Sequence, residues 1–114
     1  MGTLYTTIGL FAAAAIAGIY LLAIILQDKE TPKGITLIHG LFAAVAICLL
    51  IYYSTQNNPA PIESLVLFIL AALGGFVVVF RDLTGKKIPK WLAVTHGLIA
   101  VVGFIVLLVF TANR

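Results

Sequence analysis

Four long apolar runs, separated by short clusters of charged residues, constrain this sequence more than any other feature. A helix needs about 20 apolar residues to cross ~30 Å of hydrocarbon, and each run has that length. The runs predict spans at residues 4–27, 34–54, 62–81 and 89–111. Of the 114 residues, 62% are hydrophobic and 10% are charged, which is more apolar surface than so short a chain can bury in water. The sequence therefore predicts an integral membrane protein.

Helices are the expected secondary structure, because a span in lipid must satisfy its own backbone hydrogen bonds and barrel strands would be shorter and alternate in polarity. Thr31 followed by Pro32 predicts a helix N-cap with proline in the first turn, and Pro61 and Pro89 also precede apolar runs. The expected fold is an all-α, up-down four-helix membrane bundle, with residues 1–114 forming a single domain.

The two halves of the chain resemble each other at a shift of 57 residues, without a gap. Matching positions include Pro-Lys, a second lysine and His-Gly-Leu, which apolar composition does not explain; the pairs are Lys29 with Lys86, Pro32-Lys33 with Pro89-Lys90, and His39-Gly40-Leu41 with His96-Gly97-Leu98. We therefore predict an internal duplication, with repeat 1 at 1–57 and repeat 2 at 58–114. Because each repeat contains two spans, both repeats have the same orientation in the membrane. They are then related by a pseudo-two-fold axis along the membrane normal.

This symmetry predicts that His39 and His96 lie at equal depth on helices that face each other across the bundle. Each follows its repeated Pro-Lys by six residues, roughly 9 Å along a helix, and so lies inside the hydrocarbon. They are the only histidines of the chain. An ionisable side chain at such depth is a candidate functional residue, and the alternative is polar bonding between helices.

Two symmetric histidines favour haem over a bare metal ion. Zinc requires three or four protein ligands, whereas a porphyrin supplies four nitrogens and needs only two axial ligands from the protein. Small residues lie one and two turns from each histidine on the same helix face, which predicts a slot for the flat ring. The lysines of the two Pro-Lys pairs are the expected partners of its propionates. The expected cofactor-binding residues are His39, His96, Gly40, Gly97, Ala43, Ala100, Ala46, Gly103, Lys33 and Lys90, with His39 and His96 as the metal ligands.

Basic residues predict the orientation in the membrane. They concentrate in the hairpin loops at 28–33 and 82–88, while the stretch at 54–61 has none. By the positive-inside rule the two hairpin loops face the cytoplasm and both termini face outward.

With two histidines expected on diagonal helices of a four-helix membrane bundle, the chain resembles small four-helix membrane b-type cytochromes. The repeated His-Gly-Leu motif also resembles small bacterial membrane proteins of unassigned role. The first resemblance implies a bis-histidine haem b, and two histidines rather than four imply one haem per chain. The second implies a multi-pass protein of the bacterial inner membrane.

The leading functional hypothesis is a single-haem electron carrier near the cytoplasmic side, rather than a catalyst, since bis-histidine iron has no open position. Its expected partners are the lipid bilayer and a redox partner or the quinone pool, with assembly into homo-oligomers left open and no nucleic acid. The alternatives are a haem-free structural or assembly subunit of a membrane complex, and a small transporter like the four-helix multidrug exporters. Those exporters use a glutamate in the first span, where this chain has none.

Overall fold

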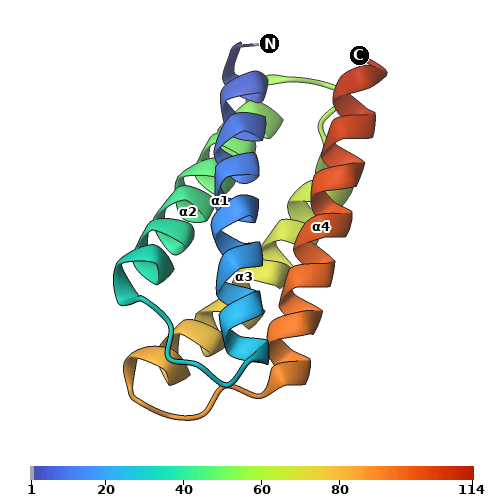
Figure 1. Ribbon diagram of the computed structural model, residues 1–114. Helices are drawn as coiled ribbons and strands as arrows, with labels where there is room; N and C mark the ends of the chain where they lie inside the picture. Colours follow the sequence, from blue (N-terminus) through green and yellow to red (C-terminus); the bar gives the residue numbers. More distant parts are fainter. Residues whose placement is uncertain (1) are drawn as a thin grey trace.

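The computed structural model of the protein describes residues 2–114 and contains four α-helices (Figure 1). They are α1 (Gly2–Leu26), α2 (Lys33–Gln56), α3 (Ile62–Leu83) and α4 (Lys90–Ala112). All four are long and apolar enough to cross a membrane, as in a multi-pass membrane protein. The all-α class is therefore confirmed, and the bounds of each predicted span agree with those of an observed helix to within a few residues.

Proline sets the start of the last three helices, because it cannot donate the hydrogen bonds that a helix interior requires. Pro32, Pro61 and Pro89 are the N-cap residues of α2, α3 and α4, and none of these caps includes a side-chain hydrogen bond. The predicted capping role of Thr31 is wrong. Its hydroxyl donates instead to the carboxylate of Asp82, at 2.8 and 2.6 Å from the two oxygens, because that charged acceptor lies within reach.

The helices α1 and α3 end in the same kind of turn. Each is followed by a residue in the left-handed region, Asp28 with φ 58° and Gly85 with φ 74°. After Gly85, the amide of Lys86 donates back to the carbonyl of Arg81 at 2.9 Å, and the equivalent bond after Asp28 is 3.1 Å long. These are Schellman motifs, which satisfy carbonyls that a helix end leaves without a partner.

Neighbouring helices enclose a narrow core. α1 packs beside α2 and α4, and α3 also packs beside α2 and α4, so α1 faces α3 and α2 faces α4 across the bundle. The two termini lie at the same end as the α2–α3 connection, and the α1–α2 and α3–α4 loops lie together at the other end (Figure 1).

Buried residues recur at a spacing of 57 positions. Seven pairs of buried residues show it: Leu4 and Pro61, Thr7 and Ser64, Phe11 and Phe68, Ala14 and Ala71, Thr36 and Ala93, Ala46 and Gly103, and Leu50 and Leu107. At the centre, the rings of Phe11 and Phe68 stack across the diagonal, with centroids 3.8 Å apart and planes inclined by 7°. Both halves therefore contribute matching positions to one core.

The outer surface is apolar along the helices. Phe76 is 75% exposed and Ile16 is 73% exposed, and many other large apolar side chains also face outward. In water such a surface would drive aggregation, whereas acyl chains solvate it without cost. The arrangement is typical of a bundle that lies in lipid.

Candidate functional site

His39 and His96 meet in the interior of the bundle. They come from α2 and α4, the helices on one diagonal, and their ring centroids are 6.2 Å apart. The two ring planes are perpendicular, at 90°. Facing positions on diagonal helices thus bring together the two histidines that the sequence singles out.

Each ring is held by a backbone carbonyl of the preceding helix. His39 Nδ1 lies 2.8 Å from the Ala14 oxygen, and His96 Nδ1 lies 2.6 Å from the Ala71 oxygen. A carbonyl can only accept, so in both neutral rings Nδ1 carries the hydrogen and donates it. The other nitrogen, Nε2, then has the lone pair that could bind a metal ion.

Glycines one turn beyond these carbonyls allow the rings to approach. A Cβ atom at Gly18 would lie 2.9 Å from His39 Cε1, and a Cβ atom at Gly75 would lie 2.6 Å from His96 Cε1. No side chain fits at such distances, so glycine is required for the ring to reach the carbonyl. Gly18 and Gly75 are not among the site residues that the sequence predicts; their equivalence at the 57-residue shift was the available signal.

The other small residues of the predicted slot occupy several environments. Ala46 is buried, and Ala43 and Ala100 are partly buried. The space beside Gly103 is filled, since a Cβ atom there would lie 3.2 Å from Leu67 and 3.5 Å from the ring of Phe68.

Gly40 and Gly97 lie outside the contact between the histidine rings. A Cβ atom at Gly40 would meet nothing within 4 Å, and one at Gly97 would meet only Leu22, at 4.0 Å. These two glycines therefore leave room away from the histidine pair rather than between the rings.

The two Pro-Lys lysines form ion pairs that cross between the halves of the chain. Lys33 Nζ lies 2.7 Å from Asp82, and Lys90 Nζ lies 3.1 Å from Asp28. The first pair is the more enclosed, because the Asp82 side chain is 9% exposed and also accepts hydrogen bonds from Thr31 and, at 3.4 Å, from Thr36. Both lysines lie at the loop end of the bundle, and each already has an anionic partner there.

Two hollows open on the surface of the bundle. One, of about 610 Å³, lies at the end with the termini and is lined by residues such as Glu63, Phe110 and Arg114. The other, of about 470 Å³, lies between α1 and α2 on the apolar surface, beside Ile16 and Tyr20. Neither hollow is lined by a histidine.

Within residues 2–114, no three side chains of histidine, cysteine, aspartate or glutamate converge on a point where a metal ion could be held. His39 and His96 are thus the donor set that a metal centre in this interior would use. No protein-family model, curated protein or solved structure matches the chain. Its function has to be inferred from this geometry.

Proposed function

We propose that the protein is a membrane-embedded b-type cytochrome that binds one haem b between His39 and His96 and carries electrons. The separation of the two imidazoles is the observation that supports this function best. An imidazole nitrogen lies about 2 Å from a metal that it binds and about 1 Å from its own ring centre, so two axial rings on one metal have centres about 6 Å apart. The observed 6.2 Å agrees with that spacing.

The hydrogen bonds of the rings support the same assignment. Metal-binding histidines usually donate a hydrogen bond from the N–H of their second ring nitrogen to a carbonyl or carboxylate, which fixes the tautomer and raises the basicity of the ligand. Ala14 and Ala71 accept such bonds here and leave both Nε2 atoms without protons. The donor set thus fits a bis-histidine haem, which supplies one-electron chemistry when bound.

Binding of the macrocycle requires space next to the histidines. Phe11 and Phe68 fill the adjacent layer of the core, toward the end with the termini. The proposed site therefore needs these two rings to move apart, with Ala43, Ala46, Ala100 and Gly103 lining the space that opens.

Three further features belong to this proposal. The chain arose by duplication of one hairpin, which is supported by the recurrence of buried residues and histidine contacts after 57 positions. It lies in a bacterial inner membrane, with the loops at 28–33 and 82–88 in the cytoplasm, as the distribution of basic residues favours. Electrons pass to a redox partner or to the quinone pool on that side.

A visible spectrum of the protein, purified after expression with ample haem, tests the proposal. Sharp Soret and alpha bands that change with reduction are expected, and His39→Gln or His96→Gln should remove the low-spin spectrum. Glutamine can still donate to the carbonyl of Ala14 or Ala71, so the helix contact survives while the axial ligand is lost. Phe76→Ala, on the lipid-facing surface, is the control that should keep the spectrum.

A haem-free structural subunit is the second candidate, and one observation favours it. Each histidine ring already bonds to a carbonyl of the neighbouring helix and packs against a glycine there, so the two histidines can join helices without any ligand. In that case the purified protein is colourless, and His39→Ala lowers its thermal stability while His39→Gln largely preserves it.

A further inference from the structure

The positive charge of this protein is concentrated in and directly beside one of its two hairpin loops. Residues 81–90 contain four cations and one anion, a net charge of +3; these are Arg81, Lys86, Lys87 and Lys90 against Asp82. Residues 28–33 contain two cations and two anions and are neutral. The formal net charge of the whole chain is also +3, so residues 81–90 account for all of it.

Three of these cations have no acidic partner among the residues that the structure describes. Asp28 pairs with Lys90, and Asp82 pairs with Lys33 from the other half. Within residues 2–114, no carboxylate forms an ion pair with Arg81, Lys86 or Lys87. An external anion can therefore bind them without displacing an internal one.

The same three residues are joined in one compact turn. The Lys86 amide donates to the Arg81 carbonyl at 2.9 Å, and Arg81 Nε donates to the Lys87 carbonyl at 2.7 Å. The Arg81 guanidinium thus joins the end of α3 to the loop. Because the backbone of the turn is already ordered, little backbone entropy is lost when an anion binds.

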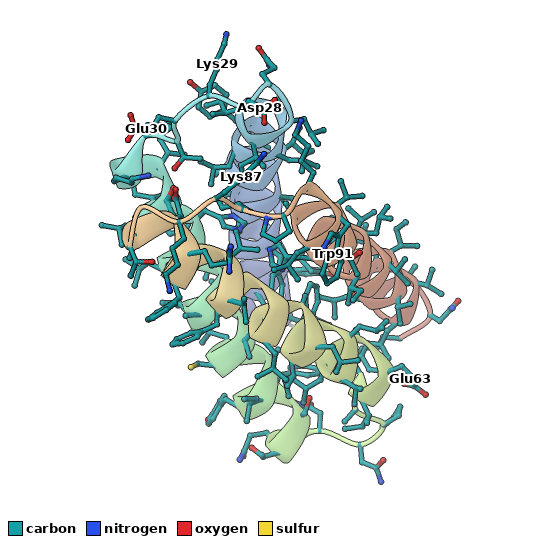
Figure 2. All side chains as sticks on the ribbon, turned by 90° about the horizontal axis from the view of Figure 1, so that it is seen from below. Asp28, Lys29, Glu30, Glu63, Lys87 and Trp91 are labelled. Carbon is teal, nitrogen blue, oxygen red and sulfur yellow. The ribbon has the colours of Figure 1, made fainter. Side chains whose placement is uncertain are left out.

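An exposed tryptophan places this turn at the boundary between lipid and water. Phe80 is 57% exposed and Trp91 is 69% exposed, and Lys86 Nζ lies 5.9 Å from the centre of the Phe80 ring. Tryptophan favours the headgroup level of a bilayer because its ring is amphipathic. Figure 2 looks onto this end and shows Asp28, Lys29 and Glu30 gathered on the other loop, away from Trp91 at the start of α4.

From these features we infer that Arg81, Lys86 and Lys87 bind the phosphate headgroup of an anionic phospholipid in the leaflet on the loop side. Guanidinium and ammonium groups bind phosphate through charge-assisted hydrogen bonds, and anionic leaflets attract basic residues next to a membrane span. The assignment does not depend on haem, since it uses only the charges and aromatic residues of the α3–α4 loop.

Trp91 is the only tryptophan of the chain and reports on nearby lipid. The full-length protein is placed in phosphatidylcholine vesicles with a minor fraction of phosphatidylglycerol. Two preparations are compared: in one the acyl chains of phosphatidylcholine carry bromine, which quenches tryptophan fluorescence, and in the other those of phosphatidylglycerol do. At equal content of brominated lipid, we expect phosphatidylglycerol to quench Trp91 more strongly. Lys87→Gln should lower that preference about fivefold, the weight of one basic residue beside an anionic membrane.

Lys29→Gln is the matched control, because it removes the same charge from the other loop, where Glu30 offsets it. An unchanged preference in this variant supports a specific site in the α3–α4 loop. Equal losses in the two variants would indicate a general surface potential and overturn the assignment. Removal of the preference by inorganic phosphate would show that the turn binds free anions instead, and absence of any preference in the wild type would also overturn it.

Discussion

Lys33 Nζ lies 2.7 Å from Asp82 Oδ1, so the first half of the chain supplies the cation and the second half the anion of the most enclosed ion pair. The carboxylate also accepts hydrogen bonds from Thr31, and Lys33 donates to the Thr31 hydroxyl at 3.0 Å. This network joins the start of α2 to the end of α3. Its partners are charged and partly shielded from water, so its loss should be measurable.

Asp82→Asn should lower the free energy of unfolding by about 2 kcal/mol, because it removes a charge-assisted acceptor beside Lys33. Lys90→Gln breaks the other ion pair, whose side chains are 45% and 63% exposed, and should cost no more than about 0.5 kcal/mol. Reversible unfolding in mixed detergent micelles measures both. Similar losses in the two variants would mean that the enclosure of Asp82 adds nothing.

Gly75→Ala should displace His96, since the new Cβ atom would lie 2.6 Å from His96 Cε1. Overpacking of this kind costs about 1–3 kcal/mol, and a bound haem should lose its low-spin bands in the same variant. Gly74→Ala is the neighbouring control, because its Cβ atom would meet only His96 Cβ, at an ordinary 3.7 Å. If the two variants unfold at the same temperature, the glycine does not govern the position of the ring.

Gly85→Ala should destabilise the protein by about 1 kcal/mol, because φ is 74° at this position and side chains disfavour the left-handed region. The reverse change is available 57 residues earlier. Asp28→Gly should stabilise the protein by about 0.5–1 kcal/mol, since it relieves the same strain and loses only an exposed ion pair. A loss of stability in Asp28→Gly would show that the pair with Lys90 outweighs the backbone strain.

Phe68→Ala should lower the stability of the haem-free protein by about 3–5 kcal/mol, because it removes a ring from the centre of the core. If haem enters where Phe11 and Phe68 stack, the same variant should take up added haem faster than the wild type. Stopped-flow absorbance in the Soret region measures this rate. Uptake at the wild-type rate would contradict the proposed position of the macrocycle while leaving the ligand assignment intact.

The sequence predicts the helices well because membrane spans are specified by run length, and prolines at 32, 61 and 89 mark their starts. It also identifies His39 and His96 as a matched pair, since equal offsets within two similar halves imply equal depth. Their observed closeness supports that interpretation of the 57-residue shift.

The sequence could not predict which side chains pair with each other. Nothing local indicates that Lys33 pairs with Asp82 or that Thr31 bonds the same carboxylate rather than capping α2, because both contacts depend on how the two hairpins pack. The roles of Gly18 and Gly75 depend likewise on the distance between neighbouring helices. Contacts between elements are fixed by tertiary packing, which composition and spacing constrain only loosely.

The crossed ion pairs make the two hairpins non-interchangeable. Asp82 of the second half corresponds to Ile25 in the first, and Asp28 of the first half corresponds to Gly85 in the second. Two copies of the first hairpin could thus form only the exposed kind of ion pair, between Lys33 of one copy and Asp28 of the other. Two copies of the second hairpin could form only the enclosed kind, between Lys90 and Asp82. If the chain were cleaved between α2 and α3, only the association of one fragment of each kind would restore the two different ion pairs together.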